Sequence, residues 1–455
     1  MTTDHEQIDV SIRIRKTSFY SVLYVRMMTQ ERQKKDKDRE KIEMKIWLKT
    51  FLLSGLLLLL FGLQPSQSLA SGNAKILLDG YPLSFPVQPQ VVKGTTLVPF
   101  RAIAEAMGIQ VQWDNATRTI VATNPNGTAG TQLRLQINNA TAYVNNQPIK
   151  LAVSPTLYKG SALIPLRVFS EQFGATVNWD GANQTVLLQS PPKDIYTMAF
   201  YAISSFSERQ LIPSFDSVAF GWARINENGE FTLQGKDFYW PKSAGDVTPE
   251  GIVSEAKAGG TQPYFMVFAS DRKGELMKML QTAQLRQQTI DGILQTVRNQ
   301  PFEGVALDFE GLGLSGDIEL EKRLYTEFIG QLAPVLHQEG KKLSLILHPP
   351  NGSYKGYDYA QLSAMADDLI IMAYDYGQKG QPENLDKVNE AIQLALKQVP
   401  KEKLILGISM GSENAGTINS KIGLAKRYGL KGVSLWRLGL IGEPTYLEMK
   451  KAVAM

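Results

Sequence analysis

From about residue 194 to the end, the chain alternates short apolar runs with amphipathic stretches. Eight runs are apolar on both faces, as expected of buried parallel strands, and the segments 318–339 and 385–398 have helical periodicity. The predicted strands span residues 195–203, 216–223, 263–269, 304–309, 342–348, 368–374, 403–409 and 432–437. This pattern predicts an α/β fold, with a closed (β/α)8 TIM barrel over residues 191–455.

An internal repeat precedes the barrel. "KGTTLVPFRAIAEAMGIQVQWDNATRTIVA" starts at Lys93, and "KGSALIPLRVFSEQFGATVNWDGANQTVLL" starts at Lys159, an offset of 66 residues. Each copy predicts a turn, a short strand, a helix and two further strands around a Trp-Asp turn. Residues 71–190 are therefore expected to form a small α+β domain of two repeats, with "QSPPK" as the linker.

The segment 44–70 has the three-part layout of a secretory signal. Lys45 and Lys49 precede an apolar run over 51–63, and Ser68-Leu69-Ala70 offers a cleavage site. An uncleaved membrane anchor is the alternative. Residues 1–43 are polar and without clear period, so we interpret them as a mistranslated or disordered leader, with Met44 as the true start.

Charge and composition exclude several classes of function. Residues 1–70 hold 12 Lys/Arg and 8 Asp/Glu, and the remaining chain holds 36 of each, so it offers no electrostatic basis for binding nucleic acid. The chain has no cysteine, which excludes disulfides, thiolate metal sites and cysteine nucleophiles. The three histidines are far apart in sequence, so a histidine-rich metal site is not expected.

Two carboxylates stand at the end of the fourth barrel strand. In "FEGVALDFEGLGLSG", which starts at Phe302, strand alternation turns Val305, Leu307 and Phe309 to the helices. Asp308 and Glu310 then face the lumen at the C-terminal mouth, where barrel active sites form. A solvated rim or a salt-bridge pair is the alternative. Two close carboxylates raise the pKa of one of them, which suits a proton donor at neutral pH.

The repeats resemble the copper amine oxidase-like N-terminal domain, a module of bacterial surface proteins, through "LVPFR…W-D" and "LIPLR…W-D". The resemblance implies association with the cell envelope. No copper or other metal is assigned, because residues 71–190 contain no histidine, cysteine or methionine cluster, and no cofactor is expected. Trp113 and Trp179 are expected to pack beside the turns, with stacking on sugars as the alternative.

Three motifs in the barrel resemble glycoside hydrolase family 18, within which the chain looks closest to bacterial spore and cell-wall glycosidases. "EGVALDFE" (303–310) resembles its fourth-strand signature, "MAYD" (372–375) its sixth-strand motif and "GVSLWRL" (432–438) its eighth strand. The chain departs from the signature at Glu303 and Ala306, where the family carries aspartates.

The resemblance implies substrate-assisted, retaining hydrolysis. Glu310 would be the acid and base, Asp308 would hold the acetamido N–H of the substrate, and Tyr374 would bond to the acetyl group. Met372, Asp375 and Trp436 would line the subsite. Tyr201, at the end of the first strand, is a further candidate for substrate binding, and His348 is either a substrate contact or a packed structural residue.

We therefore expect an exported or envelope-bound glycosidase that cleaves N-acetylglucosamine-containing glycans of peptidoglycan or spore cortex. A chitinase of the same mechanism is one alternative. A non-catalytic, lectin-like barrel is another, which Ala306 supports and Glu310 opposes. Gly432 follows Ser409 by only 23 positions, so we expect one helix there, no additional lobe and an open cleft suited to a cross-linked polymer.

Overall fold

The computed structural model describes Thr29, residues 75–124 and residues 130–455. The expected leader (1–43) and signal segment (44–70) lie outside these residues, apart from Thr29, and stay predictions. The chain separates into Met1–Gly72 and Asn73–Met455, of which the second is described below. In the described part of the chain, no helix combines the length and apolar character needed to span a membrane.

The two repeats fold alike, element for element. The first contains β1 (Lys75–Leu78), β2 (Tyr81–Pro82), β3 (Gln90–Val92), β4 (Thr95–Pro99), α2 (Phe100–Met107), β5 (Gln110–Asp114) and β6 (Thr119–Thr123). The second contains β8 (Thr141–Val144), β9 (Gln147–Lys150), β10 (Thr156–Tyr158), β11 (Ser161–Pro165), α3 (Leu166–Gln172), β12 (Thr176–Asp180) and β13 (Thr185–Gln189). A further strand, β7 (Gln132–Gln136), lies between them.

The repeats exchange their first hairpins. β1 and β2 complete the sheet β12-β13-β1-β2, while β8 and β9 complete the sheet β5-β6-β7-β8-β9. In a third sheet β4 pairs with β11, and Val98 lies opposite Ile164, its equivalent at the repeat offset. The two copies are therefore related by a local two-fold arrangement around one shared core.

The repeated Trp-Asp pair has a local explanation. Asp114 accepts hydrogen bonds from the Thr117 hydroxyl and from the backbone N–H groups of its turn, and these bonds lower its pKa. Asp180 accepts equivalent bonds from the Asn183 side-chain amide and from the backbone of its own turn, which lower its pKa in the same way. Trp113 packs against the core as expected. Trp179 is 55% exposed and does not pack against the core, so the expected core packing is wrong for this residue.

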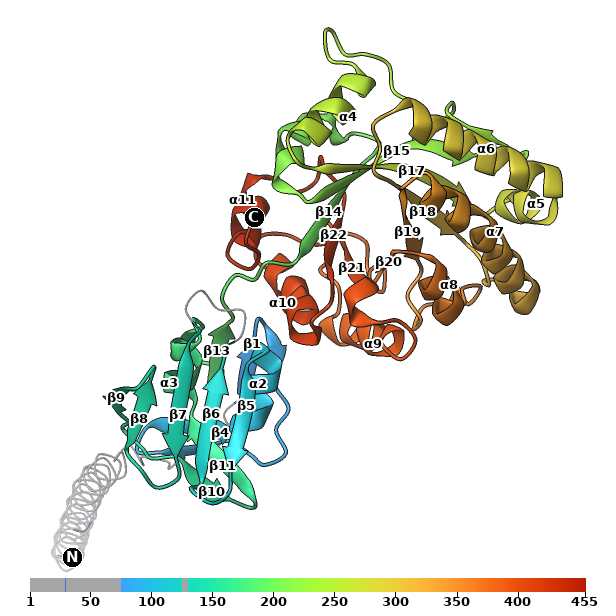
Figure 1. Ribbon diagram of the computed structural model, residues 1–455. Helices are drawn as coiled ribbons and strands as arrows, with labels where there is room; N and C mark the ends of the chain where they lie inside the picture. The colour runs from blue at the N-terminus through green and yellow to red at the C-terminus, as the bar shows by residue number, and fades with distance from the viewer. Residues whose placement is uncertain (1–28, 30–74, 125–129) are drawn as a thin grey trace, which may run out of the picture. The chain divides into compact units, whose positions relative to one another are not determined.

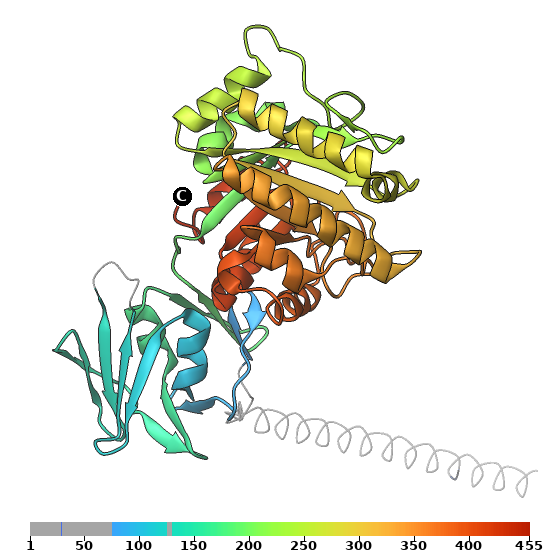
Figure 2. The same ribbon diagram turned by 45° about the vertical axis from the view of Figure 1, so that its right-hand side comes forward.

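Eight parallel strands close a barrel, which confirms the predicted fold (Figures 1 and 2). In the sheet order they are β14 (Tyr196–Tyr201), β22 (Gly432–Trp436), β21 (Leu404–Ser409), β20 (Asp368–Ile371), β19 (Lys342–Leu347), β18 (Gly304–Glu310), β17 (Gln262–Ser270) and β15 (Ser217–Ile225), which pairs back to β14. The short strand β16 (Phe231–Thr232) pairs antiparallel with the end of β15.

Helices cover the outside of the barrel. They are η1 (Ser205–Ser214), α4 (Pro249–Ala258), α5 (Glu275–Gln281), α6 (Ala283–Asn299), α7 (Ile318–Gln338), α8 (Tyr359–Met365), α9 (Leu385–Ala395), η2 (Lys401–Lys403), α10 (Ile418–Tyr428) and α11 (Glu443–Met449). The connection from β21 to β22 holds α10 alone, which confirms the expectation of one helix there.

Strand alternation separates two apolar layers. Val305, Leu307 and Phe309 belong to the large core between barrel and helices, as predicted. Ala306, on the opposite face, belongs to a smaller cluster in the lumen. Asp308 and Glu310 share the parity of Ala306, so β18 directs both carboxyl groups towards the lumen and its C-terminal mouth.

Candidate active site

Glu310 is the last residue of β18, and Asp308 lies two residues before it. On one side Asp308 pairs with Phe268 of β17, and on the other with Ile346 of β19, so two neighbouring strands fix the backbone here. The Tyr357 hydroxyl donates a 2.8 Å hydrogen bond to the carbonyl of Phe309. The backbone between the two acids is thus held from three sides.

The Asp308 side chain is buried, with 4% of its surface exposed. Its Oδ1 has no hydrogen-bond partner among the described residues. Burial raises the pKa of Asp308 well above its usual value, and the nearby charge of Glu310 raises it further. The unpartnered oxygen of Asp308 is therefore available to accept a hydrogen bond from a substrate group. The raised pKa also means that Asp308 and Glu310 are not readily ionised at the same time.

Burial also raises the pKa of Glu310, to about 7. The positive charge of Arg272 opposes this effect, and the negative charge of Asp375 adds to it. A carboxyl group with a pKa near 7 exchanges its proton at neutral pH, which suits a group that both donates and accepts a proton in one reaction cycle.

Arg272 is a site residue that the sequence reasoning missed. It lies in the loop that follows β17, and Glu275 shapes that loop by accepting hydrogen bonds from the Ser270 hydroxyl (2.9 Å) and the Lys273 backbone N–H (2.7 Å). The signal was its place just beyond the C-terminal end of a barrel strand, where loops gather around the mouth.

The segment after β20 brings the "MAYD" residues to the mouth. Met372 belongs to the lumen cluster, and Tyr374 packs against that cluster. Burial raises the pKa of Tyr374, and so do the charges of Asp308, Glu310 and Asp375. The tyrosine hydroxyl therefore remains protonated, close to the carboxylate pair, where it is able to donate a hydrogen bond.

A buried network holds this segment. Glu383 accepts hydrogen bonds from the backbone N–H groups of Asp375 (2.9 Å) and Tyr376 (3.1 Å). The N–H of Glu383 donates to Glu413 (2.9 Å), which forms a fully buried ion pair with Lys421 (2.7 Å). Asp375 has a φ of 62°, in the left-handed region that side chains disfavour, so it needs such support. No pattern in the sequence indicated this network.

Aromatic rings line the mouth around Trp436. This indole ends β22 and contacts Phe200 and Phe238, with ring centroids 5.4 and 6.2 Å apart. Phe238 also stacks on Phe268 at 4.1 Å. Phe200 and Phe268 have the lumen parity of their strands, so strand alternation could have identified them. Phe238 lies outside any strand, and nothing in the sequence marked it.

Tyr201 does not join these residues. Its side chain belongs to the outer core, with ring centroids 5.3 Å from Phe220 and 5.8 Å from Trp222. The sequence reasoning chose the last residue of the strand, but alternation sends the preceding one, Phe200, into the lumen. The structure therefore corrects the position of Tyr201 relative to the carboxylate pair.

His348 follows β19 and stacks on Tyr354, with ring centroids 3.8 Å apart. Burial lowers the pKa of His348 to about 4, so its ring is neutral at neutral pH. Its Nε2 is buried without a partner among the described residues. Nor do these residues contain a group of three or more histidines, aspartates or glutamates placed to bind a metal ion.

Known protein families match both the repeat domain and the barrel. The copper amine oxidase N-terminal domain matches residues 77–188, and the glycosyl hydrolases family 18 matches residues 197–413. Among curated proteins, YdhD of Bacillus subtilis (strain 168), named as a sporulation-specific glycosylase, is 24% identical over 232 residues, which are 47% of this chain and 51% of that protein.

The cortical fragment-lytic enzyme of Bacillus subtilis (strain 168) is 24% identical over 148 residues, 30% of this chain and 33% of the relative. The chain thus spans a third to a half of the length of these relatives. The crystal structure of the Bacillus cereus spore cortex-lytic enzyme SleL matches with a TM-score of 0.48 and 18% identity, over 58% of this chain and 75% of SleL. The barrel segment 197–413 thus matches glycosyl hydrolases family 18, and the segment 77–188 ahead of it matches the copper amine oxidase N-terminal domain.

Proposed function

We propose that this glycosidase is exported and hydrolyses β-linked, N-acetylglucosamine-containing glycans of peptidoglycan or spore cortex. The observation that carries the proposal is Glu310, whose pKa is raised to about 7, beside buried Asp308 with an unpartnered oxygen. The name of the cortical fragment-lytic enzyme supports the choice of polymer, and that of YdhD, a sporulation-specific glycosylase, supports the class of enzyme. The signal-like segment 44–70 supports export.

The proposed mechanism uses the acetamido group of the substrate as the nucleophile. Glu310 protonates the glycosidic oxygen, and the acetamido oxygen attacks the anomeric carbon to give an oxazolinium ion. Asp308 accepts a hydrogen bond from the acetamido N–H and balances the positive charge on the ring. Glu310 then removes a proton from water, which opens the ring with retained configuration. Tyr374 bonds to the acetyl oxygen, and Trp436 packs under the sugar.

Asp375 and Met372 complete the proposed subsite, the first at its rim and the second in the lumen wall. The repeat domain is proposed to keep the enzyme at the cell envelope, with the exposed indole of Trp179 as one available contact for a glycan. This attachment concerns retention and not chemistry, because the carboxylate pair lies within the barrel.

The test is to incubate purified residues 71–455 with peptidoglycan sacculi, spore cortex and colloidal chitin, and to identify the new reducing ends by mass spectrometry. We expect faster release from the wall polymers, with N-acetylglucosamine at the new reducing end. Preference for chitin would instead identify a chitinase. Binding to glycans without any cleavage would identify a lectin-like barrel, the outcome that Ala306 keeps open.

A further inference from the structure

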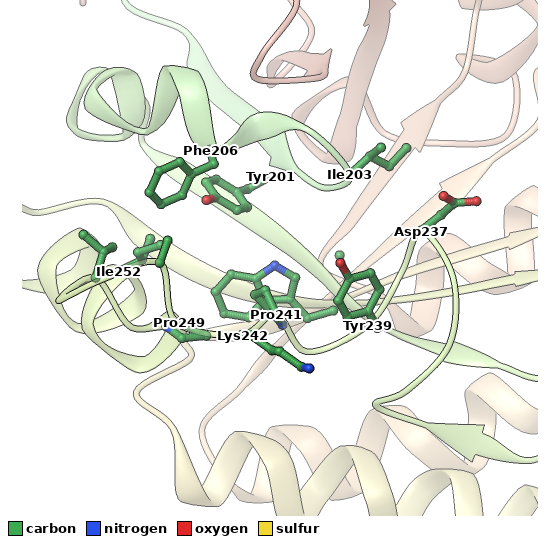
Figure 3. Close-up of a pocket in the computed structure, with 13 residues that line it drawn as sticks. Tyr201, Ile203, Phe206, Asp237, Tyr239, Pro241, Lys242, Pro249 and Ile252 are labelled. Carbon is green, nitrogen blue, oxygen red and sulfur yellow. The ribbon is translucent and has the colours of Figure 1, made fainter.

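A second pocket lies on the outer side of the barrel, beside the mouth (Figure 3). It has a volume of about 200 Å³ and is lined by the end of β14, η1, β15, the segment 237–247 and the start of α4. Tyr201 and Trp222 line it, and both belong to the outer core and not to the lumen. The pocket is therefore separate from the subsite formed by Asp308, Tyr374 and Trp436.

Aromatic rings dominate the walls of this pocket. Tyr201, Phe206, Trp222 and Tyr239 contribute four rings. Phe206 is 39% exposed and Tyr239 is 43% exposed, so two rings remain accessible at the opening. Aromatic faces of this kind cover the apolar C–H faces of a sugar ring, and such walls with a few polar groups are typical of small-ligand sites.

Two buried residues in the walls, Tyr201 and Trp222, carry polar groups that lack protein partners. Tyr201 and Trp222 are only 6% and 3% exposed. In the described part of the chain, no group forms a hydrogen bond with the Tyr201 hydroxyl or with the Trp222 indole N–H. Both atoms nevertheless keep some accessible surface. In Figure 3 the hydroxyl of Tyr201 points towards the side of Phe206 and Ile252.

The neighbouring tryptophan shows the contrast. The indole N–H of Trp240 donates a 2.9 Å hydrogen bond to Glu250, and Trp240 does not line the pocket. Polar groups that fold into a protein interior normally find partners. The unpaired donors of buried Tyr201 and Trp222 therefore suit a ligand that brings an oxygen acceptor to them.

The pocket is linked to the catalytic mouth through three consecutive residues. Asp237 and Tyr239 line the pocket, while Phe238 between them stacks on Phe268 and contacts the ring of Trp436. The second pocket and the aromatic wall of the mouth are therefore joined by one short segment. Lys242, at the rim, is the one cation among the residues that line it.

We infer that this pocket binds one N-acetylated sugar residue of the glycan substrate, outside the catalytic subsite. The aromatic rings cover the sugar ring, and the Tyr201 and Trp222 donors bond to its acetamido carbonyl oxygen. The volume exceeds the ~30 Å³ of one water several times and lies below the ~300–1,000 Å³ of pockets for larger ligands, which suits a single sugar. The lining holds one anion, Asp237, and one cation, Lys242, so it has no net positive charge to attract the acidic peptide stems of the wall. The inference rests on the proposed substrate class.

The experiment measures binding without turnover. In the full chain carrying Glu310→Gln, calorimetric titration with hexa-N-acetylchitohexaose is compared with titration after the further change Tyr201→Phe, which removes one hydroxyl. We expect roughly threefold to tenfold weaker binding, the usual worth of one hydrogen bond. The loss should be absent for the N-deacetylated oligomer. Trp222→Phe should weaken binding similarly, and the control Trp240→Phe should leave it unchanged.

Equal affinity with and without the Tyr201 hydroxyl would overturn the inference. So would binding of a free wall stem peptide that Tyr201→Phe weakens while the hexasaccharide is unaffected, since the pocket would then hold peptide. The unfolding midpoint of each variant without ligand separates loss of contact from loss of fold. If the parent enzyme cleaves no glycan but its binding depends on Tyr201, the proposed function fails and the pocket stands. If it cleaves wall glycan and Tyr201→Phe has no effect, the pocket fails alone.

Discussion

Glu310→Gln should make the protein more stable above pH 7 while abolishing hydrolysis. An ionised carboxylate is disfavoured in this buried position, and the glutamine amide has nearly the same shape without the charge. The folded-state pKa is raised, so the native state holds its proton at pH values where the unfolded chain has released it. Stability of the wild type relative to the variant is therefore highest at low pH and is lost as the pH rises through about 7.

The size of the effect follows from the shift. A rise of the Glu310 pKa from 4.5 to about 7 makes the ionised form unfavourable by about 3 kcal/mol in the folded state. Most of this cost accumulates between pH 4.5 and 7, and it is constant above that range. Removing the Glu310 charge also lowers the cost of ionising Asp308, an effect of the same sign.

Urea unfolding of wild type and variant at pH 4, 5.5, 7 and 8.5 measures this. The difference in unfolding free energy should grow from near zero to about 3 kcal/mol in favour of the variant. As a matched control, Glu402→Gln changes a side chain that is 70% exposed and should alter stability little at any pH. If the difference in unfolding free energy does not change from pH 4 to 8.5, burial does not raise the pKa of Glu310, and the proton-donor argument loses its physical basis.

Three further predictions concern other parts of the chain. Asp308→Asn should lower turnover at least a hundredfold, because an amide does not balance the oxazolinium charge. A thiazoline mimic of that intermediate should inhibit the wild type. If the wild type cleaves N-deacetylated and acetylated glycans at equal rates, substrate assistance is wrong. Lys421→Met should leave the Glu413 charge buried and unpaired, which should lower the free energy of unfolding in urea by about 3–5 kcal/mol. Adding Glu413→Gln to the same chain should restore part of this loss, and an unchanged stability of Lys421→Met would disprove the role of the pair. Deleting residues 71–190 should weaken retention on insoluble wall in a sedimentation assay but spare cleavage of short soluble oligosaccharides; loss of both in a folded truncation would place part of the site in the repeats.

The sequence predicted the barrel well because its strands are buried on both faces and therefore stand out as apolar runs. Asp308 and Glu310 were placed by strand alternation, a rule that holds wherever a strand is regular. The same rule, applied to the first strand, would have selected Phe200 instead of Tyr201.

The direction of the loop side chains was beyond prediction for a physical reason. Arg272 and Phe238 reach the mouth from segments without regular period, so their direction depends on tertiary contacts such as the Glu275 turn and the stack on Phe268. Trp179 shows a related limit, since it matches Trp113 in the repeat yet differs from it in exposure. Equivalent sequence positions need not have equivalent neighbours when two copies build different sheets.

The exchanged hairpins make the repeat domain indivisible. A fragment that begins after Leu78 lacks a segment of the first repeat, yet the damage appears in the second, where β13 loses its parallel partner β1. The bare edge left on β13 is a template for strand pairing with another molecule. Shortened chains should therefore associate through this unpaired edge, because none of them retains the strand that covers it. Neither repeat is a portable module, and only the pair is.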